Sequence, residues 1–520
     1  MFPGLFPSHS SPSDVLSPPE PVLGQKYAPY ISLMIPVLLA PWTLMFVLMI
    51  RQVTLRPMKE KTVTILVVGD IGRSPRMMYH ASSFAKKGWQ VFLIGYKETK
   101  PILDLIDNPL VKIYDLLEPP SLLSSFPWIL RAPIRVFYQV YSIIQLAIWE
   151  IPVNTEVLLV QNPPSIPTLP VAQLISFASD AKLFVDWHNT GYSILGLRVG
   201  KNNPLTKIAL GIERLFGGSA WAHLFVTKAL EQYLATDWNL QGRRAVLHDR
   251  PPSHFHRTTP AVQHELFHRL SSLISPSLPA NLRNKSSAEN DSTPFTELSS
   301  TKEPVLRSDR PALVVSSTSW TADEDFSLLV TALDAYQAAI TKFSKGKSTR
   351  LPKLIVLITG KGALRSSFEK TVAQREKTTW KDVTARCIFL PAEDYPVLLG
   401  SADLGVSLHT SSSGRDLPMK VVDMFGCGTP VLAKGFGCIG ELVKEGKNGR
   451  IFRNGEELGE QLIEVLESFP GAPQLVELQS DFHGNGQKEA ADGFHAEWNT
   501  WDENWDKVVD EGLLSKLERD

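Results

Sequence analysis

The sequence predicts an α/β protein with two doubly wound domains that face each other across a cleft, preceded by one N-terminal transmembrane helix. Two observations support the α/β class. Short apolar, strand-like runs alternate with helical stretches from residue 62 onward, which indicates mostly parallel sheets with helices on both faces. The runs form two series separated by a polar stretch, and 520 residues are too many for one hydrophobic core. Ligands are expected at the carboxyl ends of the strands, along the cleft.

The N-terminal region differs in composition from the rest of the chain. Residues 1–29 are rich in proline and serine and are expected to form a disordered luminal tail. Residues 30–50 carry no charge, and a helix of that length spans roughly 31 Å, about the thickness of a bilayer's hydrocarbon core. Lysine and arginine gather after this span rather than before it, which places the rest of the chain in the cytosol. We therefore expect a single-pass signal anchor; a buried core helix is the alternative.

Charge and cysteine content narrow the class of protein. The net charge is −1, without the basic excess of a nucleic-acid-binding protein, so no nucleic acid partner is expected. The three cysteines fit no zinc spacing and cannot all pair with one another, which suits a reducing compartment.

The domain boundaries follow the two series of strands. The first domain is expected at 62–255 and the second at 311–470, and the serine-rich stretch 271–310 between them is interpreted as a flexible insertion. One apolar stretch, 128–149, contains arginines and a proline near its start. It is either a helix lying at the bilayer surface or a buried helix of the first domain. The strand-like runs are 62–68, 90–96, 156–161, 182–187, 223–228 and 245–249, then 312–317, 353–360, 387–390, 402–408 and 430–433.

The loop after the first strand has the composition of an anion-binding turn. Residues 69–80, GDIGRSPRMMYH, follow the apolar run 62–68 and place glycines and arginines at the start of a helix. Helix N-termini offer free N–H groups to phosphates, and arginine forks bind them. The spacing matches neither the dinucleotide fingerprint nor the P-loop. A tight strand-to-helix turn with solvated arginines is the alternative.

A second candidate site lies at 408–433. A strand at 402–408 ends in a Ser/Gly loop, and Pro418 is expected to open the following helix. Such a loop suits a diphosphate, to which a lysine in the first helical turn adds charge, and an acid one turn later could accept hydrogen bonds from ribose hydroxyls. A solvated loop and helix is the alternative. The candidate diphosphate- and ribose-binding residues in this segment are Ser412, Ser413, Gly414, Lys420 and Asp423.

These motifs resemble a known group of enzymes. VVDMFGCGTPV (421–431) is similar to the nucleotide-sugar domain of GT-B glycosyltransferases, in which an acid precedes A-x-x-x-G-x-P-V, although Asp423 replaces the usual Glu. Eight residues earlier, where that superfamily usually carries a first Glu, this chain has Arg415. The chain resembles the chitobiosyldiphosphodolichol β-mannosyltransferase family over about 62–470. The resemblance is carried by 69–80, 161–172, 186–197, 316–329, 358–365 and 393–431.

The resemblance implies a fold, a reaction and partners. It implies a GT-B fold and transfer of the first, β-1,4-linked mannose from GDP-mannose to GlcNAc2-diphosphodolichol on the cytosolic face of the endoplasmic reticulum. No tightly bound cofactor and no divalent metal are expected, and the partners that the resemblance suggests include a complex with other lipid-linked oligosaccharide mannosyltransferases. In GT-B proteins a tail such as 471–520 often returns to the first domain. Two alternatives stay open: a GT-B transferase that uses a UDP-sugar, and a catalytically silent, membrane-tethered scaffold.

The resemblance also suggests roles for individual residues. An inverting transfer needs a general base, for which the order of preference is Asp70, then His188, then Asp186. A structural histidine is the alternative for His188, and plain packing is the alternative for Trp320. The motif Thr321–Glu324 is interpreted as a helix capping box rather than a metal site. The acceptor diphosphate is assigned to Gly69, Gly72, Arg73 and Arg76, and further donor contacts to Ser316, Trp320 and Lys361.

Overall fold

The computed structural model describes residues 61–118, 128–151, 155–274, 292–321, 324–343, 350–411, 413–480, 482 and 500–519. The predicted luminal tail (1–29) and transmembrane helix (30–50) lie outside these residues. Among the helices of the described ranges, none combines the length and the hydropathy needed to cross a bilayer.

The first domain is built on a seven-stranded parallel sheet with the order β3-β2-β1-β4-β5-β6-β7. Its central strands are continuous apolar runs because helices cover both faces of the sheet. The strands are β1 (Thr62–Asp70), β2 (Gln90–Tyr96), β3 (Val111–Asp115), β4 (Val157–Asn162), β5 (Lys182–Trp187), β6 (Ser219–Phe225) and β7 (Gln241–Val246). The helices are η1 (Ile71–Arg73), α2 (Pro75–Lys86), α3 (Leu103–Ile106), α4 (Trp128–Trp149), α5 (Thr168–Ser179), α6 (Gly191–Val199), α7 (Pro204–Gly217) and α8 (Lys228–Trp238).

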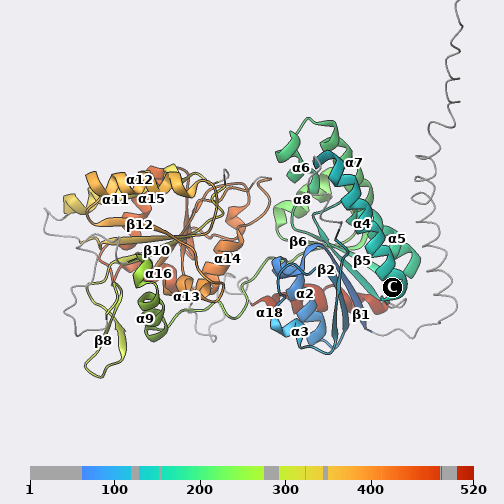
Figure 1. Cartoon of the computed structure of the whole chain (residues 1–520), viewed down its shortest axis with the longest axis horizontal. Helices are drawn as coiled ribbons and strands as arrows, with labels where there is room; N and C mark the ends of the chain where they lie inside the picture. The colour runs from blue at the N-terminus through green and yellow to red at the C-terminus, as the bar shows by residue number, and fades with distance from the viewer. Residues whose placement is uncertain are drawn as a thin grey trace, which may run out of the picture.

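The second domain is built on a six-stranded parallel sheet with the order β12-β11-β10-β13-β14-β15. Figure 1 shows the two domains as separate lobes. The strands are β10 (Ala312–Ser317), β11 (Leu354–Thr359), β12 (Val383–Ile388), β13 (Leu404–Ser407), β14 (Val431–Lys434) and β15 (Gly449–Phe452). The helices are α9 (Pro260–Arg269), α10 (Ser271–Ile274), α11 (Phe326–Phe343), α12 (Arg365–Thr378), α13 (Asp394–Ser401), α14 (Met419–Gly426), η4 (Ile439–Glu441), α15 (Gly455–Leu466) and α16 (Pro473–Ser480).

Two doubly wound parallel sheets confirm the predicted α/β class. Within the two parallel sheets, the strands that the sequence did not predict are β3 and β15, and both lie at sheet edges. Both are short, and β3 is only partly buried, so neither produces a long apolar run. Strand β7, the other edge of the first sheet, begins earlier than the predicted run 245–249. The prediction missed its first residues because they are polar.

The predicted flexible insertion at 271–310 is wrong for much of its described part. Strands β8 (Thr296–Leu298) and β9 (Pro304–Leu306) form an antiparallel hairpin. Phe295, just before this hairpin, is fully buried, with its ring centroid 4.5 Å from that of Phe267 in α9. Phe295 and a 2.9 Å hydrogen bond between the buried Thr296 and His264 of α9 anchor the hairpin to the second domain, and a composition rich in serine does not reveal such an anchor.

The C-terminal residues pack on the first domain. After α16, Phe482 contacts Phe425 of the second domain, with 5.3 Å between ring centroids. Helix α18 (Trp501–Trp505) then lies against α2, as Figure 1 shows. It is followed by η5 (Asp506–Asp510) and η6 (Leu514–Arg519), and Trp501 and Trp505 belong to the hydrophobic core of the first domain.

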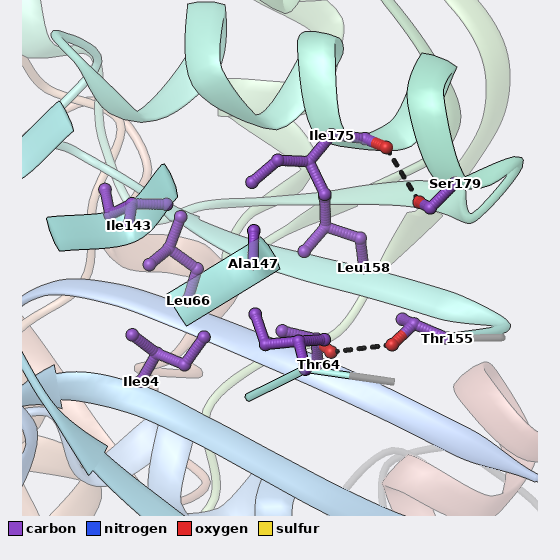
Figure 2. Close-up of a pocket in the computed structure, with 10 residues that line it drawn as sticks. Thr64, Leu66, Ile94, Ile143, Ala147, Thr155, Leu158, Ile175 and Ser179 are labelled. Carbon is purple, nitrogen blue, oxygen red and sulfur yellow. Dashed lines mark hydrogen bonds between the residues drawn. The ribbon is translucent and has the colours of Figure 1, made fainter. Parts of the chain in front are cut away.

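Helix α4 has one buried face and one exposed apolar face. Ile143 and Ala147 point from α4 into a small apolar cavity above the sheet, which Leu66 and Ile94 line from below (Figure 2). Phe137, Tyr141 and Trp149 of the same helix are exposed. Residues 128–149 therefore pack on the first domain and also present aromatic side chains to the outside.

Candidate active site

The carboxyl ends of strands from the two sheets meet across the domain boundary. Thr227, after β6, donates its hydroxyl to the carbonyl of Arg415, which follows β13, over 2.6 Å. Glu441 of η4 accepts from the backbone N–H groups of Lys228 and Ala229 at the start of α8, over 2.7 and 2.8 Å. His248, after β7, contacts the same carboxylate at 3.0 Å. The segments that carry the predicted site residues therefore face one another.

Asp70 ends β1 and holds the turn that follows. Its carboxylate accepts from the hydroxyl and the backbone N–H of Thr99, over 2.6 and 3.1 Å, and from the N–H of Gly72 over 3.3 Å. Burial alone would raise the pKa of Asp70, but these hydrogen bonds and Arg73 lower it below its usual value. A carboxylate so occupied is better suited to fixing the loop than to removing a proton.

The two glycines of this loop have different surroundings. A Cβ on Gly72 would lie 2.3 Å from the hydroxyl oxygen of Thr99, so the missing side chain serves a contact within the protein. A Cβ on Gly69 would come no nearer than 4.0 Å to Val67. Arg73 forms a 3.3 Å ion pair with Asp70 while its side chain stays 71% exposed, and it can reach a ligand.

Arg76 does not present its guanidinium to the cleft. Its Nε and one terminal nitrogen donate hydrogen bonds to the two carboxylate oxygens of Asp186, over 2.8 and 2.9 Å. The other terminal nitrogen donates to Asp249 and to the carbonyl of Leu247, each over 2.8 Å. The side chain is 4% exposed. This geometry corrects the prediction that Arg76 binds the acceptor diphosphate, because its charge is used within the protein.

Asp186 and His188 form a hydrogen-bonded pair at the end of β5. Nε2 of His188 donates to Asp186 over 2.9 Å, which leaves Nδ1 with the lone pair in the neutral ring. Burial alone would raise the pKa of Asp186, but Arg76 and His188 hold that pKa well below its usual range. Asp186 is fully buried, whereas the His188 side chain is 23% exposed. His188 can meet a substrate, and Asp186 can only orient it.

In the second domain, Glu324 organises the loop after β10. Its carboxylate accepts from the N–H groups of Ser319 and Trp320, each over 3.1 Å, and from the hydroxyl of Thr318. Lys420, in the first turn of α14, forms a 3.1 Å ion pair with it. The predicted capping box that included Glu324 is wrong, because α11 begins only at Phe326. The sequence contains no local signal for this role.

Trp320 is a packing residue. It is 1% exposed and stacks on Phe326 with 4.3 Å between ring centroids, which corrects the prediction that it lines the donor cleft and favours the packing alternative. Ser316 is almost fully buried in β10. Lys361, in the exposed turn after β11, lies with Nζ 3.6 Å from the ring centroid of Phe389.

The loop before α14 is held by its own side chains. Ser413 donates to Asp416 over 3.0 Å, and Gly414 has a φ of +70°, a conformation that favours glycine. Arg415 places its guanidinium 3.8 Å from the ring centroid of Tyr233 in the first domain. Ser412 lies outside the described residues.

Asp423 lies one turn into α14 in a largely buried position. Burial raises the pKa of its carboxyl to about 7. The Tyr395 hydroxyl lies 3.5 Å away and lowers that pKa, while Asp249 of the first domain raises it further. Across the described part of the chain, no three His, Cys, Asp or Glu side chains gather closely enough to hold a metal ion.

Comparisons with known proteins agree with this arrangement. Residues 327–468 match the family described as glycosyl transferases group 1. The two domains superpose on sucrose-phosphate synthase from Thermosynechococcus elongatus with a TM-score of 0.56 at 14% identity, covering 88% of this chain and 98% of that one. The fold is thus GT-B.

Three curated relatives align along most of their length. The chain is 40% identical to chitobiosyldiphosphodolichol beta-mannosyltransferase of Mus musculus over 87% of this chain and 89% of that protein. It is also 40% identical to UDP-glycosyltransferase TURAN of Arabidopsis thaliana, over 79% and 90% of the two chains. The human mannosyltransferase shows the same 40% identity, over 86% and 91%. The chain belongs to the chitobiosyldiphosphodolichol beta-mannosyltransferase family.

Proposed function

We propose that this enzyme transfers the first mannose, in β-1,4 linkage, from GDP-mannose to GlcNAc2-diphosphodolichol during assembly of the N-glycan precursor. The observation that carries the proposal is the 40% identity, over 87% of the chain, to a relative named for this activity. The identity extends through both domains, so it includes the acceptor side as well as the donor side.

His188 is the best candidate for the general base. Inversion by direct displacement requires the acceptor hydroxyl to lose its proton as its oxygen attacks the anomeric carbon. Nδ1 of His188 would take that proton, and the Asp186 carboxylate, 2.9 Å from Nε2, would stabilise the imidazolium. The bond from the anomeric carbon to the diphosphate oxygen breaks, and GDP leaves as an anion. His188 therefore replaces Asp70 as the first choice.

The donor side would bind GDP-mannose through α14 and its neighbouring loops. Lys420 and the exposed Lys361 would offset the negative charge that develops on the leaving diphosphate. The N-terminus of α14 adds a favourable dipole for the same anion. Asp423 would accept hydrogen bonds from the ribose hydroxyls. Further donor contacts are assigned to Ser412, Ser413 and Gly414, whereas Ser316 is too deeply buried in β10 to be kept among them.

The acceptor side would combine Arg73 with a membrane-facing surface. Arg73 is charged and accessible, and Gly69 leaves room beside it for a diphosphate. The exposed Phe137, Tyr141 and Trp149 of α4 are amphipathic or apolar side chains that suit the interfacial region of a bilayer. We assign this surface to the cytosolic leaflet of the endoplasmic reticulum, with residues 30–50 as the anchor.

A UDP-sugar donor is the second candidate, because one relative at 40% identity is named a UDP-glycosyltransferase. The test is a transfer assay with full-length protein in membranes, GlcNAc2-diphosphate on a polyprenyl lipid, and GDP-mannose or UDP-sugars in parallel. Product from GDP-mannose alone, removed by β-mannosidase, supports the proposal. Product from a UDP-sugar alone transfers the assignment to that donor. No product from any donor, with protein that folds and inserts, favours the scaffold.

A further inference from the structure

We propose that the C-terminal helix α18 positions the catalytic pair, with Trp505 acting through His80 on Asp186 and thereby on His188. The inference rests on the proposed role of His188 as general base. It makes Trp505 and His80 positioning residues, because neither has to touch a substrate.

The contacts run from the end of the chain to the cleft. Nε1 of Trp505 donates to Nδ1 of His80 over 3.0 Å, and both side chains are fully buried. Nδ1 therefore carries the lone pair, and the proton of the neutral ring lies on Nε2. That Nε2 lies 3.3 Å from Oδ2 of Asp186, the oxygen that His188 contacts at 2.9 Å. Trp505 thus fixes the tautomer of His80 in which the protonated nitrogen, Nε2, faces the carboxylate.

The contact between His80 and Asp186 is of ion-pair length but falls short of hydrogen-bond geometry. Its effect on Asp186 is therefore mainly electrostatic. An N–H facing the carboxylate is favourable, whereas a lone pair facing it would be repulsive. Loss of the Trp505 donor would let the ring adopt the second tautomer and push Asp186 from its place beside His188.

Trp501 of the same helix packs on Arg76, which pairs with the Asp186 carboxylate. Its ring centroid lies 5.6 Å from the guanidinium carbon of Arg76 and 5.3 Å from the His80 ring, which it meets edge to face. Its Nε1 donates to the hydroxyl of Ser83 over 3.0 Å. Both supports of the Asp186 carboxylate, Arg76 and His80, are therefore packed under α18.

His80 stays neutral in this setting. Burial lowers its pKa, which the neighbouring Asp186 partly offsets, while Arg76 and His188 lower it further. The charged or titratable groups that face this cluster are Asp186 and His188 from β5 and the residues after it, Arg76 from α2, and Asp249 after β7. Helix α18 contributes only tryptophans to it, so its influence is exerted through the tautomer and the packing.

Several ion pairs attach α18 and η5 independently of Trp505. Lys86 pairs with Asp502 at 2.7 Å, and Lys87 pairs with Asp506 and Asp510 at 3.0 Å each. Leu513, in the same tail, is buried in the first-domain core. Trp505→Phe should therefore leave the helix docked while it removes the donor to His80. Leu513→Ala is the matched control, since it weakens packing and spares that hydrogen bond.

The test compares full-length variants in membranes by kcat, KM, pH profile and thermal unfolding. Trp505→Phe is expected to lower kcat about tenfold, with KM for either substrate within twofold of wild type, and to shift the acidic limb of the kcat profile. Leu513→Ala is expected to lower thermal stability and keep kcat. In a His80→Gln background, the introduced amide N–H faces Asp186 whether or not the Trp505 donor is present. There, Trp505→Phe should lower kcat less than threefold.

Three results would overturn the proposal: unchanged kcat in Trp505→Phe, an equal kcat loss in Leu513→Ala, or an undiminished Trp505→Phe loss in the His80→Gln background. If Trp505→Phe fails to fold, His80→Ala and His80→Gln decide, because only the second should retain kcat within threefold of wild type. His188→Ala separates this proposal from the proposed function. A wild type that makes mannosylated product while His188→Ala stays active refutes the base assignment, whatever Trp505→Phe does.

Discussion

Asp186→Asn offers the sharpest test of the buried charge cluster, because it removes one charge and almost no volume. In the wild type, Arg76 is matched by Asp186 and Asp249. Breaking a buried ion pair costs about 3–5 kcal/mol, since the remaining charge is left without a partner. Asp249 still pairs with Arg76, so we expect the lower end, about 3 kcal/mol. For a domain of 150–250 residues this corresponds to a fall in Tm of about 6–12 °C.

The same change should lower activity. Asp186 orients His188, and general-base catalysis typically contributes about 10²–10⁴-fold in rate. We expect kcat of Asp186→Asn to fall within that range, and the double variant with His188→Ala to lose little more, because two residues that act as a unit are not additive. The measurement is mannose transfer under saturating substrates, alongside thermal unfolding of the same preparations.

The difference in stability should depend on pH in a defined direction. Arg76 and His188 hold the pKa of Asp186 well below its usual range, against the effect of burial. A depressed folded-state pKa gives stability that is fully present above the unfolded value, about 3.9, and is lost as pH falls through the folded value. The free energies of unfolding of wild type and Asp186→Asn should therefore differ fully near pH 7 and converge under acid conditions.

Asp403→Asn is the matched control. Asp403 is a buried partner of Arg310 in the second domain, at 2.7 and 2.8 Å, and has no contact with the catalytic pair. It should show a comparable loss of Tm with kcat preserved. Wild-type Tm in Asp186→Asn, or a kcat as well preserved as in Asp403→Asn, would refute the reasoning.

Three further substitutions test the donor site and the first loop. Lys420→Ala should raise KM for GDP-mannose about 10-fold or more, because it removes a charged hydrogen bond worth about 1.5–3 kcal/mol. Lys420→Arg should raise this KM less. Equal KM in Lys420→Ala and wild type would remove this lysine from the site. Gly72→Ala should destabilise the protein by about 1–3 kcal/mol in thermal or denaturant unfolding through overpacking, and Gly69→Ala should not; equal effects would contradict the geometry. Because burial raises the pKa of Asp423 to about 7, wild-type KM for GDP-mannose should rise as pH falls from about 8 to 6, and a pH dependence that persists in Asp423→Asn would exclude this carboxyl as its source. The same raised pKa means that Asp423 disfavours the folded state increasingly as pH rises from about 4 to 7.

The sequence by itself determined the α/β class and the position of the loops that carry chemistry. Buried parallel strands are continuous apolar runs, and the polar residues that follow them must lie at the carboxyl edge of a sheet. That reasoning located Asp70, His188 and the loop that leads into the helix of Asp423, without any knowledge of their partners. The family was suggested separately, by the resemblance of motifs such as 69–80 and 393–431 to those of the mannosyltransferase family.

Only the tertiary structure decided which of these residues are available to a ligand. Arg76 and Arg73 look equivalent in the sequence, yet Arg76 forms a buried ion pair with Asp186, 110 residues away. Lys420 meets Glu324 across 96 residues, and Trp505 meets His80 across 425. Local propensity and periodicity specify which face of an element is buried, but not which charge or donor it meets there. That choice depends on how distant segments pack, because a buried charge must find its partner wherever the fold places one.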